Sequence, residues 1–356
     1  MTDARITGVR ARLKEEGLDA LIVSSPANVR YLTRFSGSHA LAIVTARGAF
    51  FVSDSRYALQ SAREVKGFRR IIGRLGLFED AAAAMTLRSC RAAGFESDSL
   101  TYAQFRSLRK LFPRVRFRPA SGIVESLSLV KDAQEIACIE KAAAIADAVF
   151  AEVLNTVRPG MTELEIASEV SWHNRRKGSE SDAFDVIVAG GPRGALPHAR
   201  PTARKIRKGE FVLIDFGSTV GGYCSDLTRT VSLGRPPGKL VDAYRAVLEA
   251  NESAVASARG GMSARLLDAV ARGCIRRHGF GRFFVHSLGH GIGLRVHERP
   301  RVSPLSTEML ETGSVITIEP GVYIPGRGGV RIEDDVLLGE TGCRVLTRSS
   351  RELIVL

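Results

Sequence analysis

The stretch KGEFVLIDFG, residues 208–217, decides the fold, because the chain carries a second version of it, TGSVITIEPG, at residues 312–321. Both stretches are rich in apolar and β-branched residues and predict a strand. Each also carries one acid near its end, Asp215 in the first and Glu319 in the second. The pair predicts an internal repeat, in which two similar αβ halves face each other and the matching acids meet at the centre.

The residues before each strand repeat as well. RPGMTELE, residues 158–165, is similar to RGGMSARL, residues 259–266. Thr162 and Glu165 have the spacing of a capping box, which marks the start of a helix. A long amphipathic helix is predicted over residues 132–157. Each half is thus predicted to run helix, Gly-Met cap, helix and strands, and the repeat is too long to be a solenoid unit.

Two further acids follow the repeated strands. Asp226 is separated from Asp215 by a Gly-Gly turn, and Glu333 is separated from Glu319 by the turn sequence PGRGG. Residues at equal distances from the turn of a simple hairpin lie opposite each other on the same face. We therefore expect two opposed pairs of carboxylates, although acids on strands more often lie on a solvent-facing side.

Four carboxylates among apolar strands would raise one another's pKa values, because like charges repel strongly where the dielectric is low. Two divalent cations nearly balance four carboxylates. Two ions about 4 Å apart form a recurring hydrolytic site that activates one water molecule. The hairpins therefore predict a dinuclear metal centre.

Three of the seven histidines fall in HSLGHGIGLRVHE, residues 286–298. The segment has no Glu between its first two histidines, unlike an HExxH helix, and three glycines in five residues argue against any helix. We expect an extended or turned backbone in which one of these histidines is a metal ligand, the others serve the substrate, and the glycines let that substrate approach closely.

The first part of the chain alternates short strands and helices and predicts an α/β domain over residues 1–125, followed by a second domain over residues 126–356. Residues 40–54 predict a hairpin. Residues 78–94 predict a helix, and a further helix is predicted to end at Pro113.

The composition favours a soluble globular protein, with 44% hydrophobic residues and no run near the ~20 apolar residues of a membrane span. The net charge of +13 comes from dispersed bases without a nucleic-acid-binding motif, so we expect neither nucleic acid nor membrane as a partner. The N-terminus lacks the apolar core of a signal peptide. The five cysteines are scattered without a CxxC motif, which is typical of reduced thiols in the cytoplasm.

The segments PHARP, LIDFG, YCSDLTRT, HSLGHGIGLRVHE and TIEPGVYIPGRGGVRIEDD, in this order, resemble the pita-bread metallopeptidases of the Xaa-Pro peptidase branch, which includes aminopeptidase P and prolidase. The resemblance is close from residue 124 to the C-terminus. The first domain is more loosely similar to the creatinase-type N-terminal domain. The resemblance implies a creatinase-like α/β domain followed by a pita-bread catalytic domain with a pseudo-twofold repeat.

The resemblance also implies the ligands of two divalent ions. Asp215 would chelate one ion, His290 and Glu319 would complete the other, and Asp226 and Glu333 would bridge them. The mostly oxygen ligands favour Mn²⁺ or Co²⁺, with Zn²⁺ as a further candidate.

The remaining family residues also match positions in this chain. His198, His286, His297 and Arg331 would contact the substrate or stand near it, and His198, His297 and Glu319 would take part in catalysis. The implied reaction is hydrolysis of the Xaa-Pro bond, in dipeptides or at the N-terminus of peptides, by a hydroxide that bridges the metals. A homodimer is expected from the resemblance.

Three other functions are open to a chain with these motifs. A creatinase-like C–N hydrolase, or a binding protein without activity, need not keep the metal ligands, and here all five are present. Methionine aminopeptidase usually lacks so large an N-terminal domain. The sequence leaves open whether the enzyme is a dipeptidase or an aminopeptidase.

Overall fold

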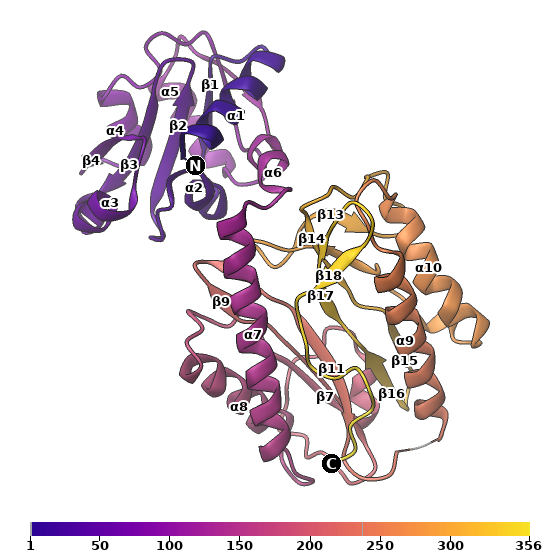
Figure 1. The fold of residues 1–356 in the computed structure, drawn as a ribbon. Coiled ribbons are helices and arrows are strands. Elements are labelled where there is room, and N and C mark those ends of the chain that lie inside the picture. Colours follow the sequence, from indigo (N-terminus) through magenta and orange to yellow (C-terminus); the bar gives the residue numbers. More distant parts are fainter. Residues whose placement is uncertain (1, 237) are drawn as a thin grey trace. The chain divides into compact units, whose positions relative to one another are not determined.

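The structure is a computed structural model that describes residues 2–236 and 238–356 (Figure 1). The chain divides into two compact units, Met1–Ser128 and Leu129–Leu356. Both units contain helices and strands, so the predicted mixed α/β class is confirmed. The assignment of residues 1–125 and 126–356 to separate domains stays a prediction. No helix in the described residues is long and apolar enough to cross a membrane.

Unit 1 is built on one six-stranded sheet with the order β4-β3-β2-β1-β5-β6. Its strands are β1 (Ala20–Val23), β2 (Ala40–Thr45), β3 (Ala49–Asp54), β4 (Arg69–Gly73), β5 (Ala92–Phe95) and β6 (Arg116–Pro119). Its helices are α1 (Thr2–Glu15), α2 (Pro26–Thr33), α3 (Ala58–Glu64), α4 (Leu77–Ala83), α5 (Tyr102–Leu111) and α6 (Ile123–Ser128), with a short 3₁₀ turn η1 (Ser55–Tyr57).

Two of the three predictions for this unit are confirmed and one is wrong. Strands β2 and β3 form the predicted hairpin, and α5 ends before Pro113. The helix predicted over residues 78–94 ends at Ala83 instead, and the last residues of that range form β5. β5 pairs in parallel with both β1 and β6 and is buried along its length. Burial in the sheet therefore outweighed the helix preference of the alanines.

Unit 2 contains the repeat, and each half runs through two helices and then strands, as predicted. The first half comprises α7 (Ala133–Thr156), α8 (Glu163–Arg176), β7 (Ile187–Gly190), η2 (Gly191–Ala195), β8 (Phe211–Phe216), β9 (Thr219–Val220), β10 (Tyr223–Cys224) and β11 (Leu227–Ser232). The second half comprises α9 (Gly238–Ser257), α10 (Ala264–Arg277), η3 (Gly281–Phe283), β12 (Gly289–Gly291), β13 (Glu298–Val302), β14 (Val315–Ile318), β15 (Gly321–Ile324), β16 (Gly328–Arg331), β17 (Asp334–Leu338) and β18 (Cys343–Val345).

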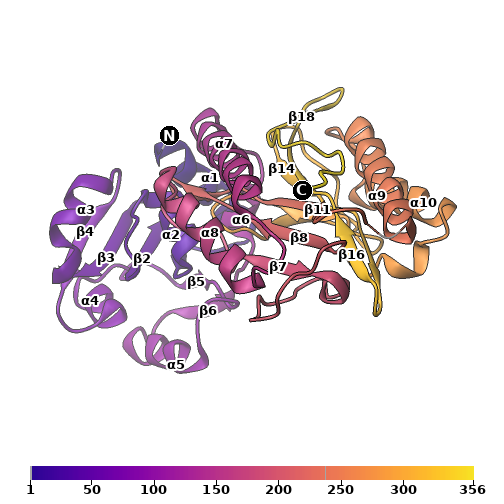
Figure 2. The ribbon, with the colours of Figure 1, turned by 90° about the horizontal axis from the view of Figure 1, so that it is seen from below.

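The two helix pairs of unit 2 cover different strands. Apolar residues of α7 and α8 pack on β7, β8 and β11, while those of α9 and α10 pack on β14 to β17. The two pairs lie on opposite sides of the strands in both ribbon views (Figures 1 and 2). The predicted capping box of Thr162 and Glu165 begins α8. Burying one apolar face of each helix leaves the strands between them as the centre of the unit.

The two halves meet along β11 and the residues around the end of β16 and the start of β17. The Glu333 amide donates to the Thr228 carbonyl over 3.1 Å, and the Asp226 amide donates to Asp335 Oδ2 over 2.9 Å. The Thr230 hydroxyl donates to the Arg331 carbonyl over 3.0 Å. One hairpin from each half is thus joined at the middle of the unit, where the acids lie.

The second hairpin has the predicted register. Ile318 pairs with Asp334 and Gly321 pairs with Arg331, which places Glu319 opposite Glu333.

The first hairpin differs from the prediction, because Asp215 pairs with Thr228 and not with Asp226. Its turn is centred between Gly221 and Gly222, one position later than expected, and both glycines have the positive φ (59° and 80°) that a tight two-residue turn requires. The shift moves Asp226 two residues along the strand. It therefore stays on the same face as Asp215, as a diagonal neighbour.

Candidate metal centre

All nine residues predicted for the site line one cleft of about 550 Å³ in unit 2. They are Asp215, Asp226, His290, Glu319 and Glu333 from the predicted metal set, and His198, His286, His297 and Arg331 from the predicted substrate side. The structure thus brings together residues from both halves of the repeat. Their individual roles remain predictions.

His290 presents a nitrogen lone pair to the carboxylates. Its ring Nδ1–H donates to the Gly291 carbonyl over 3.1 Å, which leaves Nε2 unprotonated. Nε2 lies 3.4 Å from Glu319 Oε1 and 3.8 Å from Asp226 Oδ2. Burial and the neighbouring His297 ring lower the pKa of His290 to about 4, so the imidazole is neutral at physiological pH.

The acids around this nitrogen hold more negative charge than their surroundings balance. Burial raises the pKa of Asp226, and the charge of Glu333 raises it further. Burial and the charge of Glu319 likewise raise the pKa of Glu333. The pKa of Glu319 rises to about 8, mainly through burial, although Arg331 opposes the shift. These are the shifts expected of carboxylates crowded together without a counter-ion.

The residues fit divalent ions. Ligand atoms of Asp226, His290 and Glu333 all lie within 4.8 Å of one another. Asp215 Oδ1 and Asp226 Oδ1 are buried and have no hydrogen-bond partner in the described part of the chain. Buried oxygens without partners are costly, and a cation would satisfy them. A carboxylate-rich set with one neutral imidazole suits a divalent metal.

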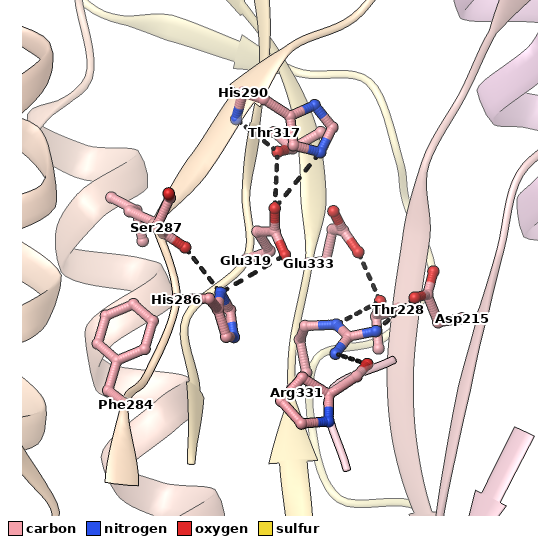
Figure 3. A network of polar contacts seen from close by, with 12 residues as sticks. Asp215, Thr228, Phe284, His286, Ser287, His290, Thr317, Glu319, Arg331 and Glu333 are labelled. Atoms are coloured by element: carbon pink, nitrogen blue, oxygen red, sulfur yellow. Dashed lines mark hydrogen bonds and ion pairs between the residues drawn. The ribbon is translucent and has the colours of Figure 1, made fainter. Parts of the chain in front are cut away.

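A network of hydrogen bonds connects two of the predicted ligands, Asp215 and Glu333, through Arg331 and Thr228 (Figure 3). Arg331 forms an ion pair with Asp215 and donates from Nε to the Thr228 hydroxyl over 3.0 Å. That hydroxyl donates in turn to Glu333. Arg331 also donates to the Tyr323 hydroxyl over 2.7 Å, and only 4% of its side chain is exposed. The guanidinium thus holds one ligand directly and another through Thr228.

Sequence reasoning missed four supporting residues. Thr228 and Tyr323 belong to the network just described, Asp335 accepts from the Asp226 amide, and Thr317 Oγ1 accepts from the His290 amide over 3.1 Å. Thr317 lies two residues before Glu319, and Thr228 lies two residues after Asp226. Because strand side chains alternate with a period of two, that spacing was the signal that placed both hydroxyls on the face of the acids.

The three other histidines lie around the metal ligands. The His286 Nδ1–H donates to the Ser287 carbonyl over 2.7 Å, so its Nε2 accepts from the Tyr323 hydroxyl at 2.9 Å. Burial and then Arg331 lower the pKa of His286 to about 3. The His297 ring centroid is 4.2 Å from that of His290, and burial followed by the His198 charge lowers the pKa of His297. The rings of His286 and His297 are therefore neutral at physiological pH.

The loop that carries His198 is held by an ion pair between Arg193 and Glu163. Arg193 donates from Nε to Glu163, a fully buried acid at the start of α8, over 2.9 Å. Glu163 also accepts from the Gly190 and Thr202 amides over 3.0 Å each. The two ends of the loop thus share one carboxylate, and His198 is exposed between them.

The glycines of residues 286–298 do not leave room for a peptide, which corrects the prediction. A Cβ on Gly289 would lie 2.0 Å from the Thr317 carbonyl oxygen, and a Cβ on Gly291 would lie 2.0 Å from that of Arg299. At Gly293 the neighbour is the Glu298 carboxylate. The space is therefore filled by adjacent backbone and side chains of the protein itself, and the segment is the strand β12 followed by a turn, with no helix.

The chain matches known families along most of its length. The model of metallopeptidase family M24 matches residues 137–340, and that of the creatinase/prolidase N-terminal domain matches residues 5–130. The sequence is 38% identical to an Xaa-Pro dipeptidase of Pyrococcus horikoshii, over 96% of each chain.

Solved structures agree with these matches. An Xaa-Pro dipeptidase from Bacillus anthracis superposes with a TM-score of 0.97 at 39% identity, with 100% of both chains covered. An X-Pro aminopeptidase from Thermotoga maritima superposes with a TM-score of 0.90 at 36% identity, covering 97% of this chain and 100% of that one. With a creatinase/prolidase N-terminal domain ahead of its catalytic unit, this chain belongs to metallopeptidase family M24.

Proposed function

We propose that this protein is a dinuclear metallopeptidase that hydrolyses the Xaa-Pro bond, in dipeptides or at the N-terminus of longer peptides. The observation that carries the proposal is the junction of the two hairpins, which gathers four carboxylates and one unprotonated imidazole nitrogen in one cleft. The substrate class is supported by the similar proteins, whose names describe Xaa-Pro dipeptidases and an X-Pro aminopeptidase.

We assign the metal ligands to Asp215, Asp226, His290, Glu319 and Glu333, with Asp226 and Glu333 as the bridging pair. The oxygen-rich set of ligands favours Mn²⁺ or Co²⁺, with Zn²⁺ as a further candidate. When bound, such ions supply Lewis acidity, which makes a water molecule acidic enough to serve as the nucleophile near neutral pH.

Glu319 is the carboxylate best placed to move a proton. Its side chain is 17% exposed in the cleft, against 8% for Asp215 and 7% for Asp226. Its two oxygens face different groups, one toward His290 and the other 3.9 Å from His286 Nδ1. We assign to it the transfer of a proton to the proline nitrogen as the peptide bond breaks.

The histidines beside the metal ligands are suited to binding the peptide. We assign to His297, which is exposed in the cleft, a hydrogen bond to the carbonyl oxygen as negative charge develops there. We place His198 and His286 around the proline side. For Arg331, its burial and its ion pair with Asp215 favour holding the carboxylates over touching the substrate.

We further propose a cytoplasmic homodimer that binds neither nucleic acid nor membranes. No disulfide joins the five cysteines in the described part of the chain, which is typical of a reducing compartment. Sedimentation of the purified protein would test the dimer, and a single monomeric species at micromolar concentration would contradict it.

The test of the activity compares an Xaa-Pro dipeptide with an Xaa-Pro-Yaa tripeptide, each with Mn²⁺, Co²⁺ or chelator. We expect cleavage with metal and its loss with chelator, and the preferred length decides between dipeptidase and aminopeptidase. An Xaa-Ala dipeptide serves as control. If the metal-loaded protein cleaves neither proline substrate, the proposal is wrong. A creatinase-like C–N hydrolase or a binding protein on this fold would then be favoured.

A further inference from the structure

The segment that carries His286 forms part of the cleft wall without belonging to a strand or a helix. Residues 284–288 lie between η3, which ends at Phe283, and β12, which begins at Gly289. Backbone outside regular structure needs other partners for its amide and carbonyl groups. In this segment, side chains of α10 bond three of those groups, one each on Phe284, His286 and Leu288.

An ion pair on α10 makes these bonds. Asp268 is 1% exposed, and its two oxygens accept from Arg272 Nε and Nη2 over 2.8 and 2.9 Å. Asp268 Oδ1 also accepts from the Leu288 amide over 3.1 Å. Arg272 donates from Nη2 to the His286 carbonyl over 2.9 Å and from Nη1 to the Phe284 carbonyl over 3.0 Å. The pair therefore bonds every second residue of the segment, as a neighbouring strand would.

The same guanidinium also contacts the Phe284 ring of this segment. Its central carbon lies 4.1 Å from the centroid of the Phe284 ring. The Phe284 ring meets the His286 ring edge-on, with centroids 5.2 Å apart and planes at 87°. Arg272 thus fixes the His286 backbone directly and its ring through Phe284, by a cation–π contact followed by an aromatic contact.

We propose that Asp268 and Arg272 are positioning residues that hold the His286 ring in the cleft and so set how tightly the proline side of the substrate is bound. Neither residue lines the cleft. This inference rests on the proposed Xaa-Pro activity for its kinetic consequence, although not for its structural one. The ion pair reaches the site from α10, in the second half of unit 2.

The test is Arg272→Lys, with Arg277→Lys as a matched control. Lysine keeps a cation beside buried Asp268, but it lacks the planar fork that reaches both carbonyls. Arg277 is on the same helix and bonds Glu249 at the surface. We expect R272K to raise the KM for an Xaa-Pro dipeptide about tenfold with kcat changed less than about twofold, because small displacements of a binding group weaken binding at this scale. R277K should leave both constants unchanged.

A double-mutant cycle with His286→Ala separates positioning from general destabilisation. If Arg272 acts through His286, R272K adds no further increase in KM to H286A. An equal tenfold increase in both backgrounds would overturn the proposal.

A second readout needs no activity. In the Zn²⁺-loaded protein, R272K should shift the His286 ring nitrogen resonances and leave those of His297 unchanged. Unchanged His286 resonances would overturn the positioning role. Absence of Xaa-Pro cleavage by the wild-type protein, with His286 shifted as expected, would refute the proposed function alone.

Discussion

The acids of the cleft differ in what balances their charge. Asp215 has the Arg331 guanidinium beside it, whereas Asp226 forms no ion pair with an arginine or lysine of the described residues and has one buried oxygen without a partner. The energetic cost of the metal-free cluster therefore concentrates on Asp226 and its neighbour Glu333.

Asp226→Asn should make the metal-free protein more stable and the metal-loaded protein inactive. The substitution replaces a carboxyl group, whose pKa is raised by burial and by Glu333, with an uncharged amide. We expect the free energy of unfolding in chelator at pH 8 to rise by about 1–3 kcal/mol. Denaturant titration measures it, and Mn²⁺ should no longer stabilise the variant. A less stable metal-free variant would contradict the charge imbalance.

The metal-free protein should lose stability as pH rises. A carboxyl group whose pKa is higher in the folded state than in the unfolded state stabilises the folded protein. This contribution is complete below the pKa of the unfolded state, and it is lost as the pH rises through the pKa of the folded state. For Glu319 the window runs from about 4.5 to about 8. Melting temperatures in chelator should fall across that window. Glu319→Gln should reduce the dependence of the melting temperature on pH. An unchanged dependence in this variant would show that another group causes it.

Thr228→Val should weaken metal binding without removing a ligand. The substitution keeps the shape of the side chain but deletes the bond to Glu333 and the acceptor for Arg331. Loss of such outer contacts typically costs 10–100-fold in affinity, so we expect about that change in a Mn²⁺ titration. Thr230→Val is the control, because Thr230 bonds only the backbone of Arg331. Equal losses of affinity in both variants would argue against a specific role for Thr228.

The elements show how far the sequence alone could predict the site. The spacing of Glu319 and Glu333 about their turn was sufficient, because the register is unbroken on both sides of the pair. The same argument failed for Asp215 and Asp226, since symmetry about the acids cannot reveal which residues form the turn. In unit 1, the alanines before β5 predicted a helix, and only pairing with distant strands decided otherwise.

Interactions between distant segments were also out of reach. The bonds from Asp268 and Arg272 to residues 284–288 were not predictable, because they join the helix to a segment that follows it in the chain. No residue type in that segment signals the contact. By contrast, the alternation of side chains along a strand was visible in the sequence, and it could have identified Thr228 and Thr317 as neighbours of the acids.

Close backbone packing explains the glycines of β12. It also predicts how much stability is lost when a glycine of this segment is replaced by alanine. A Cβ on Gly289 would meet the Thr317 carbonyl, whereas one on Gly293 would meet the end of the Glu298 side chain at 2.5 Å. Backbone cannot move as a side chain can. We therefore expect Gly289→Ala to cost about 3 kcal/mol or more and Gly293→Ala clearly less, measured by denaturant unfolding. Equal costs would contradict the packing argument.

The molecule as a whole has separate apolar cores in its two units. One core lies around the sheet of unit 1, and the others lie on the two faces of unit 2. We predict that residues 126–356 alone fold cooperatively and bind Mn²⁺, because all nine site residues lie in this unit. A soluble, cooperatively unfolding fragment in circular dichroism would support the domain assignment, and an unfolded one would refute it.

We propose that the two halves of unit 2 join to build one centre for two ions. The most direct test counts the Mn²⁺ ions bound per chain in a calorimetric titration of chelator-treated protein, with D226N alongside. We predict two ions for the wild-type protein and a loss of that stoichiometry in D226N. Saturation of the wild-type protein at one ion or none, or two ions in the variant at unchanged affinity, would contradict it.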